Sequence, residues 1–338
     1  MKILITGGCG FIGSNLASYF SKTNDITVFD SLARKGSEKN LAYLKSAVYA
    51  KKIRFVKGLI TDTVLIAKLV EETDVILHLA AQVAVTSSIA HPRDDFKINL
   101  LGTFNLLESV RRSKNKPLII YSSTNKVYGE IAGSCYQERK ARYEDTTHPD
   151  GIVEDQPLDF FTPYGCSKGG ADSYVRDFGR IYNLPTVVFR KSCIYGARQF
   201  GTEDQGWVAH FARKALLGET ITIYGNSKQV RDLLYIDDLI RLYELVIENH
   251  FKNKHKFRGE VFNVGGGAKN AYSLLEIILL LENILKRKVP TRFNMERTGD
   301  QKVYISNIEK ARKYFNWSPK ITIEHGLNKL VWFILSSK

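Results

Sequence analysis

The sequence predicts an α/β protein built on a Rossmann-type, doubly wound parallel sheet with a smaller C-terminal substrate-binding lobe. Two observations carry this prediction. Short apolar segments alternate with segments of helical periodicity over the first 190 residues, and a glycine-rich turn follows the first apolar segment. Repeated β-α units of this kind form parallel sheets with helices on both faces. A length of 338 residues accommodates such a domain together with a second, smaller lobe.

The elements follow from the apolar pattern, taken in chain order. Continuous apolar runs predict buried strands at 2–6, 26–29, 53–56, 75–81, 118–122, 186–189 and 261–264. Helical spacing predicts helices at 11–21, 96–112 and 164–182, and a mostly helical chain from 274 to the end. Residues 129–162 are polar and longer than an ordinary connection, so we expect them to fold over a ligand. We expect one domain in residues 1–190, with a strand returning from 236–265, and a substrate lobe in 191–235 and 266–338.

The composition argues against several classes of protein. No stretch approaches the roughly 18 apolar residues of a membrane span, and the apolar run at 2–6 is too short for a signal peptide. The four cysteines are scattered without a C-x-x-C pair, so we expect no disulfide framework, no metal site and a cytoplasmic location. The formal charge of +14 fits either nucleic-acid binding or a solvated surface with sites for anionic ligands. Because no nucleic-acid-binding motif accompanies the basic loops, we expect neither a nucleic-acid nor a membrane partner.

Three glycines, Gly7, Gly10 and Gly13, form a G-x-x-G-x-x-G turn between the first strand and the first helix. Glycine lets the backbone approach a pyrophosphate, and a helix N-terminus offers free N–H groups and partial positive charge. A turn without a ligand is the alternative interpretation. The acidic residue that ends the second strand, Asp30, favours a dinucleotide site.

The carboxylate of Asp30 also favours NAD, because it accepts hydrogen bonds from the adenosine ribose and repels a 2′-phosphate. The basic pair Arg34 and Lys35 leaves NADP as the alternative. Ala80 and Ala81 end the fourth strand, where small side chains leave room for a cofactor or serve ordinary packing. The histidine inside that strand, His78, is expected to be a hydrogen-bonded core residue. The other predicted cofactor-binding residues are Phe11, Ile12, Ser31, Ile60, Asp62, Leu79, Asn99, Tyr164 and Lys168.

Tyr164 and Lys168 lie four residues apart on a predicted helix and therefore share one face. A free phenol has a pKa of about 10, and a neighbouring ammonium and an oxidised nicotinamide both favour its phenolate form. Tyr164 can then accept a hydroxyl proton while hydride leaves the same carbon. A surface pair on an amphipathic helix is the alternative, and the position of the pair after the fifth strand of a nucleotide fold argues against it.

A polar run, SSTNKVYG, follows the fifth strand at the carboxyl edge of the sheet, where ligands bind in this fold. A hydroxyl at this edge can hydrogen-bond the reacting oxygen. Thr124 is the first candidate and Ser123 the second. The alternative is a set of turn residues that cap the end of the strand.

With these motifs, the chain resembles the extended short-chain dehydrogenase family of nucleotide-sugar enzymes over nearly its whole length. The strings SSTNKVYG, PYGCSKG, RQFGTEDQGWV and GNSKQVRD are similar to those of family members that epimerise C2 of CDP-linked sugars. The resemblance implies catalytic roles for Thr124, Tyr164 and Lys168, with Ser123 and Asn125 lining the site. It also implies NAD as the cofactor and a CDP-sugar as the substrate.

Two departures from the family pattern are informative. Nucleotide-sugar 4,6-dehydratases carry an Asp-Glu pair directly after the Ser/Thr, because elimination of water needs an acid and a base. This chain has Asn125 and Lys126 there, so return of the hydride is favoured over elimination. The family also has Gly-Asp-Ile after the third strand, and its Asp contacts the adenine. Here Leu59 takes that place, so Asp62 substitutes for the Asp or the adenine lacks the contact.

The resemblance places the substrate diphosphate against Arg231 and Arg297, and a planar, always-charged guanidinium suits phosphate oxygens. Further contacts to the nucleotide or sugar are expected from some of Arg198, Gln199, Gln205 and Trp207. Helices 96–112 and 164–182 pair between subunits in the family, which predicts a homodimer or a homotetramer.

The sequence is therefore compatible with three functional hypotheses. The first is an NAD-dependent epimerase that inverts C2 of a CDP-linked hexose by transient oxidation to a 2-keto intermediate and hydride return, in O-antigen lipopolysaccharide biosynthesis. The second is a nucleotide-sugar 4-epimerase of the same family. The third is a non-catalytic NAD-binding regulator, and the presence of both Tyr164 and Lys168 argues against it.

Overall fold

The computed structural model describes residues 1–252, 257–297 and 299–336. Residues 253–256 of the expected returning segment, and 298, 337 and 338 of the expected substrate lobe, lie outside the described part. The chain forms two compact units. The first unit comprises Met1–Val127, Thr162–Arg190 and Ile240–Phe262, and the second comprises Tyr128–Phe161, Lys191–Leu239 and Asn263–Lys338. Tyr128–Phe161 thus belongs to the second unit, whereas the sequence interpretation includes it in residues 1–190.

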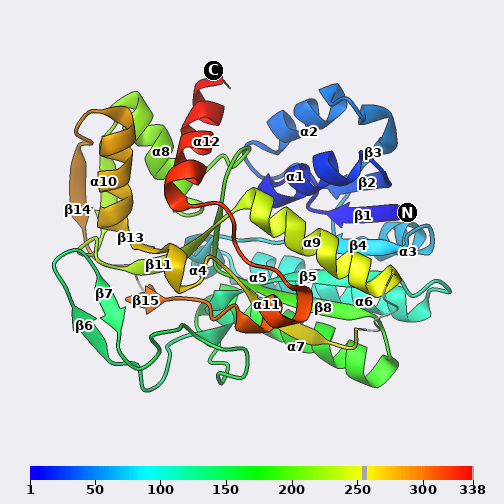
Figure 1. Ribbon diagram of the computed structural model, residues 1–338. Coiled ribbons are helices and arrows are strands. Elements are labelled where there is room, and N and C mark those ends of the chain that lie inside the picture. The colour runs from blue at the N-terminus through cyan, green and yellow to red at the C-terminus, as the bar shows by residue number, and fades with distance from the viewer. Residues whose placement is uncertain (253–256, 298, 337–338) are drawn as a thin grey trace. The chain divides into compact units, whose positions relative to one another are not determined.

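A seven-stranded sheet in the order β12-β8-β5-β4-β1-β2-β3 organises the first unit (Figure 1). The pairs β1–β2, β2–β3, β1–β4 and β4–β5 are all parallel. The chain adds strands outward from β1 on both sides, which is the doubly wound arrangement and confirms the predicted fold class. The elements of this unit are β1 (Lys2–Thr6), α1 (Phe11–Phe20), β2 (Asp25–Asp30), α2 (Ser37–Ser46), β3 (Ile53–Lys57), α3 (Thr63–Glu71), β4 (Val75–His78), α4 (Val85–Ala90), α5 (Pro92–Asp95), a π-helix (Phe96–Leu101), α6 (Gly102–Arg112), β5 (Leu118–Thr124), α7 (Thr162–Tyr182), β8 (Thr186–Lys191), α9 (Ile236–Phe251) and β12 (Glu260–Val264). Of these, β8, α9 and β12 extend into the second unit.

All seven predicted strands are present, with one shortened end. The strand predicted at 75–81 stops at His78. The N–H of Leu79 still donates to the carbonyl oxygen of Thr6 over 3.0 Å, whereas the N–H of Ala80 donates to the Thr6 hydroxyl over 3.2 Å. The helix predicted at 96–112 is continuous but begins as the π-helix Phe96–Leu101.

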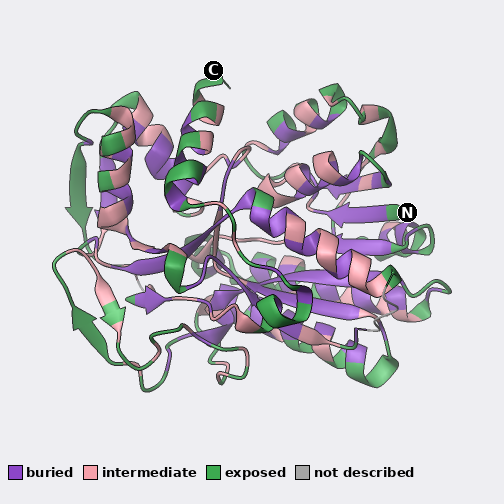
Figure 2. Cartoon of the chain, viewed as in Figure 1, coloured by how far each residue is buried: buried purple, intermediate pink, exposed green. Residues whose placement is uncertain are grey.

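Burial explains why the central strands read as uninterrupted apolar runs. Every residue of β5 is buried, and Figure 2 shows the strands of the sheet as its most buried elements. One apolar core joins the sheet to α3, α6 and α7, and it includes Leu4, Ile76, Ile119, Leu69, Leu106, Val110, Val175 and Phe178. Elsewhere in the unit, Tyr19 of α1 donates a hydrogen bond to Glu244 of α9 over 2.8 Å. Strands covered in this way need no alternation of apolar and polar residues.

The second unit contains a small mixed sheet, in which β11 pairs with β9 and β15 in parallel and with β13 in antiparallel orientation. Its elements are β6 (Tyr136–Glu138), β7 (Tyr143–Asp145), β9 (Cys193–Tyr195), α8 (Trp207–Leu217), β10 (Ile221–Tyr224), β11 (Val230–Tyr235), β13 (Ala271–Ser273), α10 (Leu274–Leu285), β14 (Thr291–Asn294), β15 (Val303–Tyr304), α11 (Glu309–Phe315) and α12 (Ile323–Ser336).

Two features of this unit refine the sequence prediction. The chain after 274 is helical only in part, because the strands β14 and β15 separate α10 from α11. The polar segment 129–162 contains the hairpin β6–β7, which Arg142 fixes to Glu276 of α10 with bonds of 2.8 and 2.6 Å. Within the described residues, none of the helices is both long and apolar enough to cross a membrane.

A buried ion pair ties three elements of the first unit together. Arg190 of β8 donates to both carboxylate oxygens of Asp172 on α7, each at 3.0 Å, and both side chains are at most 1% exposed. Ser123 of β5 donates to the same carboxylate over 2.7 Å. This cluster therefore fixes α7 against β5 and β8.

Replacing Arg190 with methionine is expected to lower the free energy of unfolding by about 3–5 kcal/mol, because it leaves the buried Asp172 carboxylate without its cation. Urea denaturation followed by circular dichroism measures the change. The control is Glu72→Gln, which breaks an exposed ion pair with Arg54 and should change the free energy of unfolding by less than about 1 kcal/mol. Equal losses in the two variants would show that the buried pair is not a structural anchor.

Candidate active site

The glycine-rich turn packs tightly against the end of β4. Gly7 has a φ of +68°, and a Cβ atom on it would lie 2.8 Å from the backbone nitrogen of Ala80. A Cβ atom on Gly13 would lie 2.4 Å from the carbonyl oxygen of Gly7. Among the described residues, no side chain caps the first turn of α1, whose N-cap is Gly10. The N–H groups of this turn are therefore placed to bind an anion.

Asp30 lies at the end of β2, as predicted, and is buried. Its carboxylate accepts hydrogen bonds from the N–H groups of Cys9 (2.9 Å) and Leu32 (2.8 Å). A carboxylate accepts about four hydrogen bonds, so acceptor capacity remains for a ligand. Arg34 follows in the next loop, and its charge interacts with Tyr164.

The remaining predicted cofactor residues surround the same strand ends of the first unit. Phe11 and Ile12 begin α1, Ser31 follows β2, and Leu79, Ala80 and Ala81 follow β4. Ile60 is buried against the position of Gly102. Asp62 is the N-cap of α3 and accepts a hydrogen bond from Leu65 N–H over 3.0 Å, while Leu59 is 62% exposed. Asp62 therefore has a structural role as a helix cap.

Tyr164 and Lys168 are both buried on α7, in agreement with their four-residue spacing. Nζ of Lys168 donates to the carbonyl oxygen of Ser122 over 2.6 Å and lies 4.3 Å from the centre of the Tyr121 ring. Thr124 is the last residue of β5, and its hydroxyl acts to lower the pKa of Tyr164. Lys168 thus reaches the carboxyl end of β5, where Thr124 lies, from the same helix that carries Tyr164.

The electrostatics of this group follow from its burial. Burial raises the pKa of Tyr164 to about 12, which the hydrogen bond from Thr124 opposes and the charge of Asp95 reinforces. Burial also lowers the pKa of Lys168 to about 7, against the charges of Asp172 and Asp95, which raise it. The phenol is therefore neutral at pH 7, and the ammonium is close to its titration midpoint.

The two candidate hydroxyls have different partners. Ser123 donates to Asp172 and is part of the buried ion-pair cluster, whereas Thr124 acts to lower the pKa of Tyr164. Thr124 also lies 3.4 Å from Oδ1 of Asn125 and accepts the backbone N–H of Lys126 over 3.2 Å. The structure therefore favours Thr124 over Ser123 as the group facing a reacting oxygen.

Sequence reasoning predicted Asn99 as a cofactor-binding residue but missed the buried polar network around it, beside the Tyr164–Lys168 pair. Asp95 accepts hydrogen bonds from Ser167 Oγ and from Asn99 Nδ2, the latter over 3.1 Å. The Asn99 amide also accepts the N–H of Gln82 (2.9 Å) and donates to its carbonyl oxygen (3.0 Å). A signal was present in the spacing, because Asp95 directly precedes the helix predicted at 96–112 and lies four residues before Asn99.

His78 is a core histidine, as predicted. Its two ring nitrogens hydrogen-bond the hydroxyls of Thr6 (2.7 Å) and Thr103 (3.0 Å). Burial, and then the charge of Lys168, lower the pKa of His78 to about 3. The ring is therefore neutral at physiological pH and serves the packing of β4.

The two arginines predicted to bind a diphosphate lie in the second unit, and both face acidic residues. Arg231 of β11 is buried, pairs with Asp300 and donates to the carbonyl oxygen of Val230 over 2.7 Å. Arg297 lies 3.4 Å from Asp204 and 3.9 Å from the centre of the Tyr224 ring. Both guanidinium groups are thus held in fixed positions.

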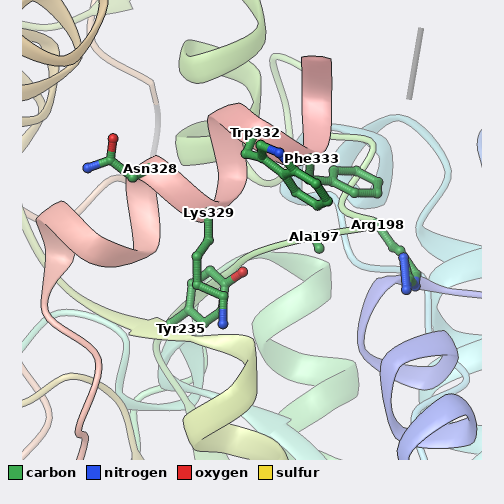
Figure 3. A pocket seen from close by; sticks show the side chains of 7 residues that line it. All are labelled: Ala197, Arg198, Tyr235, Asn328, Lys329, Trp332 and Phe333. Carbon is green, nitrogen blue, oxygen red and sulfur yellow. The ribbon is translucent and has the colours of Figure 1, made fainter. Parts of the chain in front are cut away.

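The other predicted substrate residues have more varied surroundings. Arg198 lines a cavity of about 390 Å³ with Tyr235 and four residues of α12, and it lies 5.9 Å from the Phe333 ring centre (Figure 3). Neither Arg231 nor Arg297 lines that cavity. Gln199 is buried and donates to the carbonyl oxygen of Ile194, Gln205 pairs with Thr202 through the backbone, and Trp207 begins α8.

Comparison with known proteins identifies the family. The sequence profile of the GDP-mannose 4,6 dehydratase family matches residues 4–330. This chain belongs to that family. CDP-paratose 2-epimerase of Salmonella typhi is 46% identical to it over 98% of both chains. The crystal structure of UDP-glucuronic acid 4-epimerase from Bacillus cereus, in complex with UDP-glucuronic acid and NAD, is 28% identical with a TM-score of 0.85 and covers 100% of both chains. UDP-glucose 4-epimerase of Thermotoga maritima, solved with UDP-glucose, is 29% identical with a TM-score of 0.84 and covers 100% of this chain and 99% of its own.

The close packing of the glycine turn leaves no space for a Cβ atom on Gly13. Gly13→Ala is expected to lower the free energy of unfolding by about 1–3 kcal/mol, because its Cβ atom would overlap the backbone of Gly7 and Gly8. The matched control is Gly10→Ala, whose Cβ atom would meet only the Gly7 oxygen at 3.1 Å. Thermal unfolding of the two variants measures the difference. A Gly13 variant as stable as the Gly10 variant would contradict the close packing described for the turn.

Proposed function

We propose that this protein is an NAD-dependent epimerase that inverts C2 of a CDP-linked hexose, converting CDP-paratose to CDP-tyvelose. The observation that carries the proposal is the 46% identity to CDP-paratose 2-epimerase over 98% of both chains. A second observation supports it: Asn125 and Lys126 stand where the dehydratases of the resemblance carry an acidic pair. Elimination of water requires such an acid and base, whereas epimerisation does not.

The first unit has the features that an NAD site requires. The Gly7–Gly13 packing leaves no room for a Cβ atom, the first turn of α1 presents its N–H groups, and Asp30 has acceptor capacity left for ribose hydroxyls. The first unit would hold the cofactor, and the segment that returns to it consists of the helix α9 followed by the strand β12. When bound, NAD⁺ supplies a reversible hydride acceptor whose positive ring favours a neighbouring phenolate. Related epimerase structures that contain NAD support this assignment.

Tyr164 is the proposed acid–base residue. In this role it removes the proton of the C2 hydroxyl and later returns it, while Thr124 hydrogen-bonds the same oxygen. Burial holds the pKa of Tyr164 at about 12, so the phenolate needs stabilisation by positive charge. Arg34 contributes such a charge, and in this proposal the Lys168 ammonium, one turn along α7, supplies the rest. Asn125, beside Thr124, lines this group without titrating.

The second unit is proposed to hold the nucleotide sugar. Arg231 and Arg297 are fixed in position by Asp300 and Asp204, and a diphosphate offers both guanidinium groups stronger anionic partners. Inversion requires the sugar to present both faces of C2 to the same groups. An anchored diphosphate permits this, because the sugar turns while the nucleotide stays in place.

The assembly and location are also proposals. Exposed apolar side chains on the π-helix and α7, among them Phe96 (50% exposed) and Ile181 (63%), support pairing between subunits in a homodimer or homotetramer. Within the described residues none of the four cysteines forms a disulfide bond, which suits the cytoplasm.

A 4-epimerase is the second candidate, because the similar structures from Bacillus cereus and Thermotoga maritima both invert C4 according to their names. NMR analysis of the product from a panel of CDP- and UDP-sugars distinguishes the two. We expect CDP-paratose to be converted to its C2 epimer and UDP-glucose to be left unchanged at C4. Inversion of C4 with no change at C2 in CDP-paratose or CDP-glucose would overturn the proposal.

The variant Tyr164→Phe provides the control for this assay. Loss of the proton-transferring hydroxyl should lower kcat by about 10²- to 10⁴-fold with little change in KM. Tyr174→Phe, on the exposed side of the same helix, should retain activity. If the unaltered protein converts none of the sugars and Tyr164→Phe keeps its biological activity undiminished, a non-catalytic NAD-binding regulator would be favoured.

A further inference from the structure

Asp95 is a fully buried carboxylate beside the proposed catalytic pair. It ends α5 immediately before the π-helix and has 0% exposed surface. Its oxygens accept hydrogen bonds from Ser167 Oγ and Asn99 Nδ2. Ser167 lies directly before Lys168 on α7, and its Oγ also reaches the carbonyl oxygen of Tyr164 at 3.3 Å. Asp95 is therefore linked to the turn of α7 that carries both Tyr164 and Lys168.

The environment of Asp95 differs from that of the other buried carboxylate on this side of the unit. Asp172 forms a two-point ion pair with Arg190, which neutralises its charge. Among the described residues, Asp95 forms no such pair, and its hydrogen-bond donors, Ser167 and Asn99, are uncharged. Burying a carboxylate without a cation is costly, and such groups gather at functional sites.

We propose that Asp95 is a positioning residue for the Tyr164–Lys168 pair. Its carboxylate anchors α7 at Ser167 and supplies the negative charge that balances the buried Lys168 ammonium. The proposal rests on the function proposed above, in which Lys168 must be charged to stabilise the Tyr164 phenolate.

The electrostatic balance at Lys168 supports this role. Burial lowers the pKa of Lys168 to about 7, and the charges of Asp172 and then Asp95 raise it. Because Arg190 shares the charge of Asp172, Asp95 is the carboxylate whose charge is not already neutralised. Removing it should lower the pKa of Lys168, so that the ammonium is lost at lower pH.

The other groups around the pair do not replace Asp95. From β4, His78 is neutral, because burial and Lys168 hold its pKa at about 3. From β5, Tyr121 presents its ring to Lys168 at 4.3 Å, and burial raises the pKa of its phenol well above 10. From the loop after β2, Arg34 contributes a positive charge near Tyr164. None of these three groups carries negative charge at neutral pH.

The test measures the titration of Lys168 directly in the enzyme with NAD bound. Lysine labelled with ¹³C at Cε gives a resonance that follows protonation, and Lys168→Met identifies the signal. In Asp95→Asn we expect the midpoint for Lys168 to fall by about one pH unit or more. In the profile of kcat against pH, the fall at alkaline pH should move to lower pH by the same amount. Above the Lys168 midpoint, kcat of the variant should therefore be about tenfold lower than that of the unaltered enzyme, with KM unchanged.

Two further variants keep the test decisive. Asp94→Asn alters an exposed neighbour on the same helix and should leave the Lys168 midpoint in place. If Asp95→Asn does not fold, Ser167→Ala serves instead. It removes a donor that lowers the pKa of Asp95 against the effect of burial, so the carboxylate protonates more readily and the Lys168 midpoint again falls.

An unchanged Lys168 midpoint in Asp95→Asn would overturn the proposal, whatever the activity. The titration needs no sugar substrate, so it separates this inference from the proposed function. A shifted midpoint in a protein that epimerises no CDP-sugar would leave the positioning role intact and refute the function instead.

Discussion

Nζ of Lys168 donates a hydrogen bond of 2.6 Å to the carbonyl oxygen of Ser122, and both residues are buried. This contact fixes α7 in register with the end of β5, and with it the distance of Tyr164 from Thr124. A buried ammonium is tolerated only where its charge is balanced. In the first unit, the Tyr121 ring and the carboxylates of Asp172 and Asp95 balance the charge of this ammonium.

The buried carboxylates of Asp172 and Asp95 have different roles, one structural and one electrostatic. Asp172 is neutralised by Arg190 and joins α7 to β5 and β8, so it mainly holds the helix in place. Asp95 meets only uncharged donors and sits where its charge reaches both Tyr164 and Lys168. The proton transfer proposed for Tyr164 needs both the fixed helix and the negative charge, because a phenol with a pKa of about 12 depends on an accurately placed cation.

Patterns among residues close together in the sequence predicted the strands of the parallel sheet, the glycine turn and the shared face of Tyr164 and Lys168 on α7. The bond from Ser123 to Asp172 joins residues 49 positions apart, so no spacing rule indicated that Ser123 is structural. The short strand β14 is exposed at all four residues and lacks an alternating pattern, which is why the sequence past 274 was interpreted as mostly helical. Asp95 lay within reach of sequence reasoning through its spacing from Asn99, but its burial appears only in the fold.

The central claim is that Tyr164 moves a proton only on oxygen, so that the hydrogen on C2 never reaches solvent. The direct measurement is the fate of deuterium placed at C2 of CDP-paratose, followed by NMR and mass spectrometry during conversion in ordinary water. The account predicts that the product keeps the label at C2. Loss of deuterium to the solvent, or uptake of solvent deuterium at C2 in the reverse experiment, would show removal of a proton from carbon and would contradict the account.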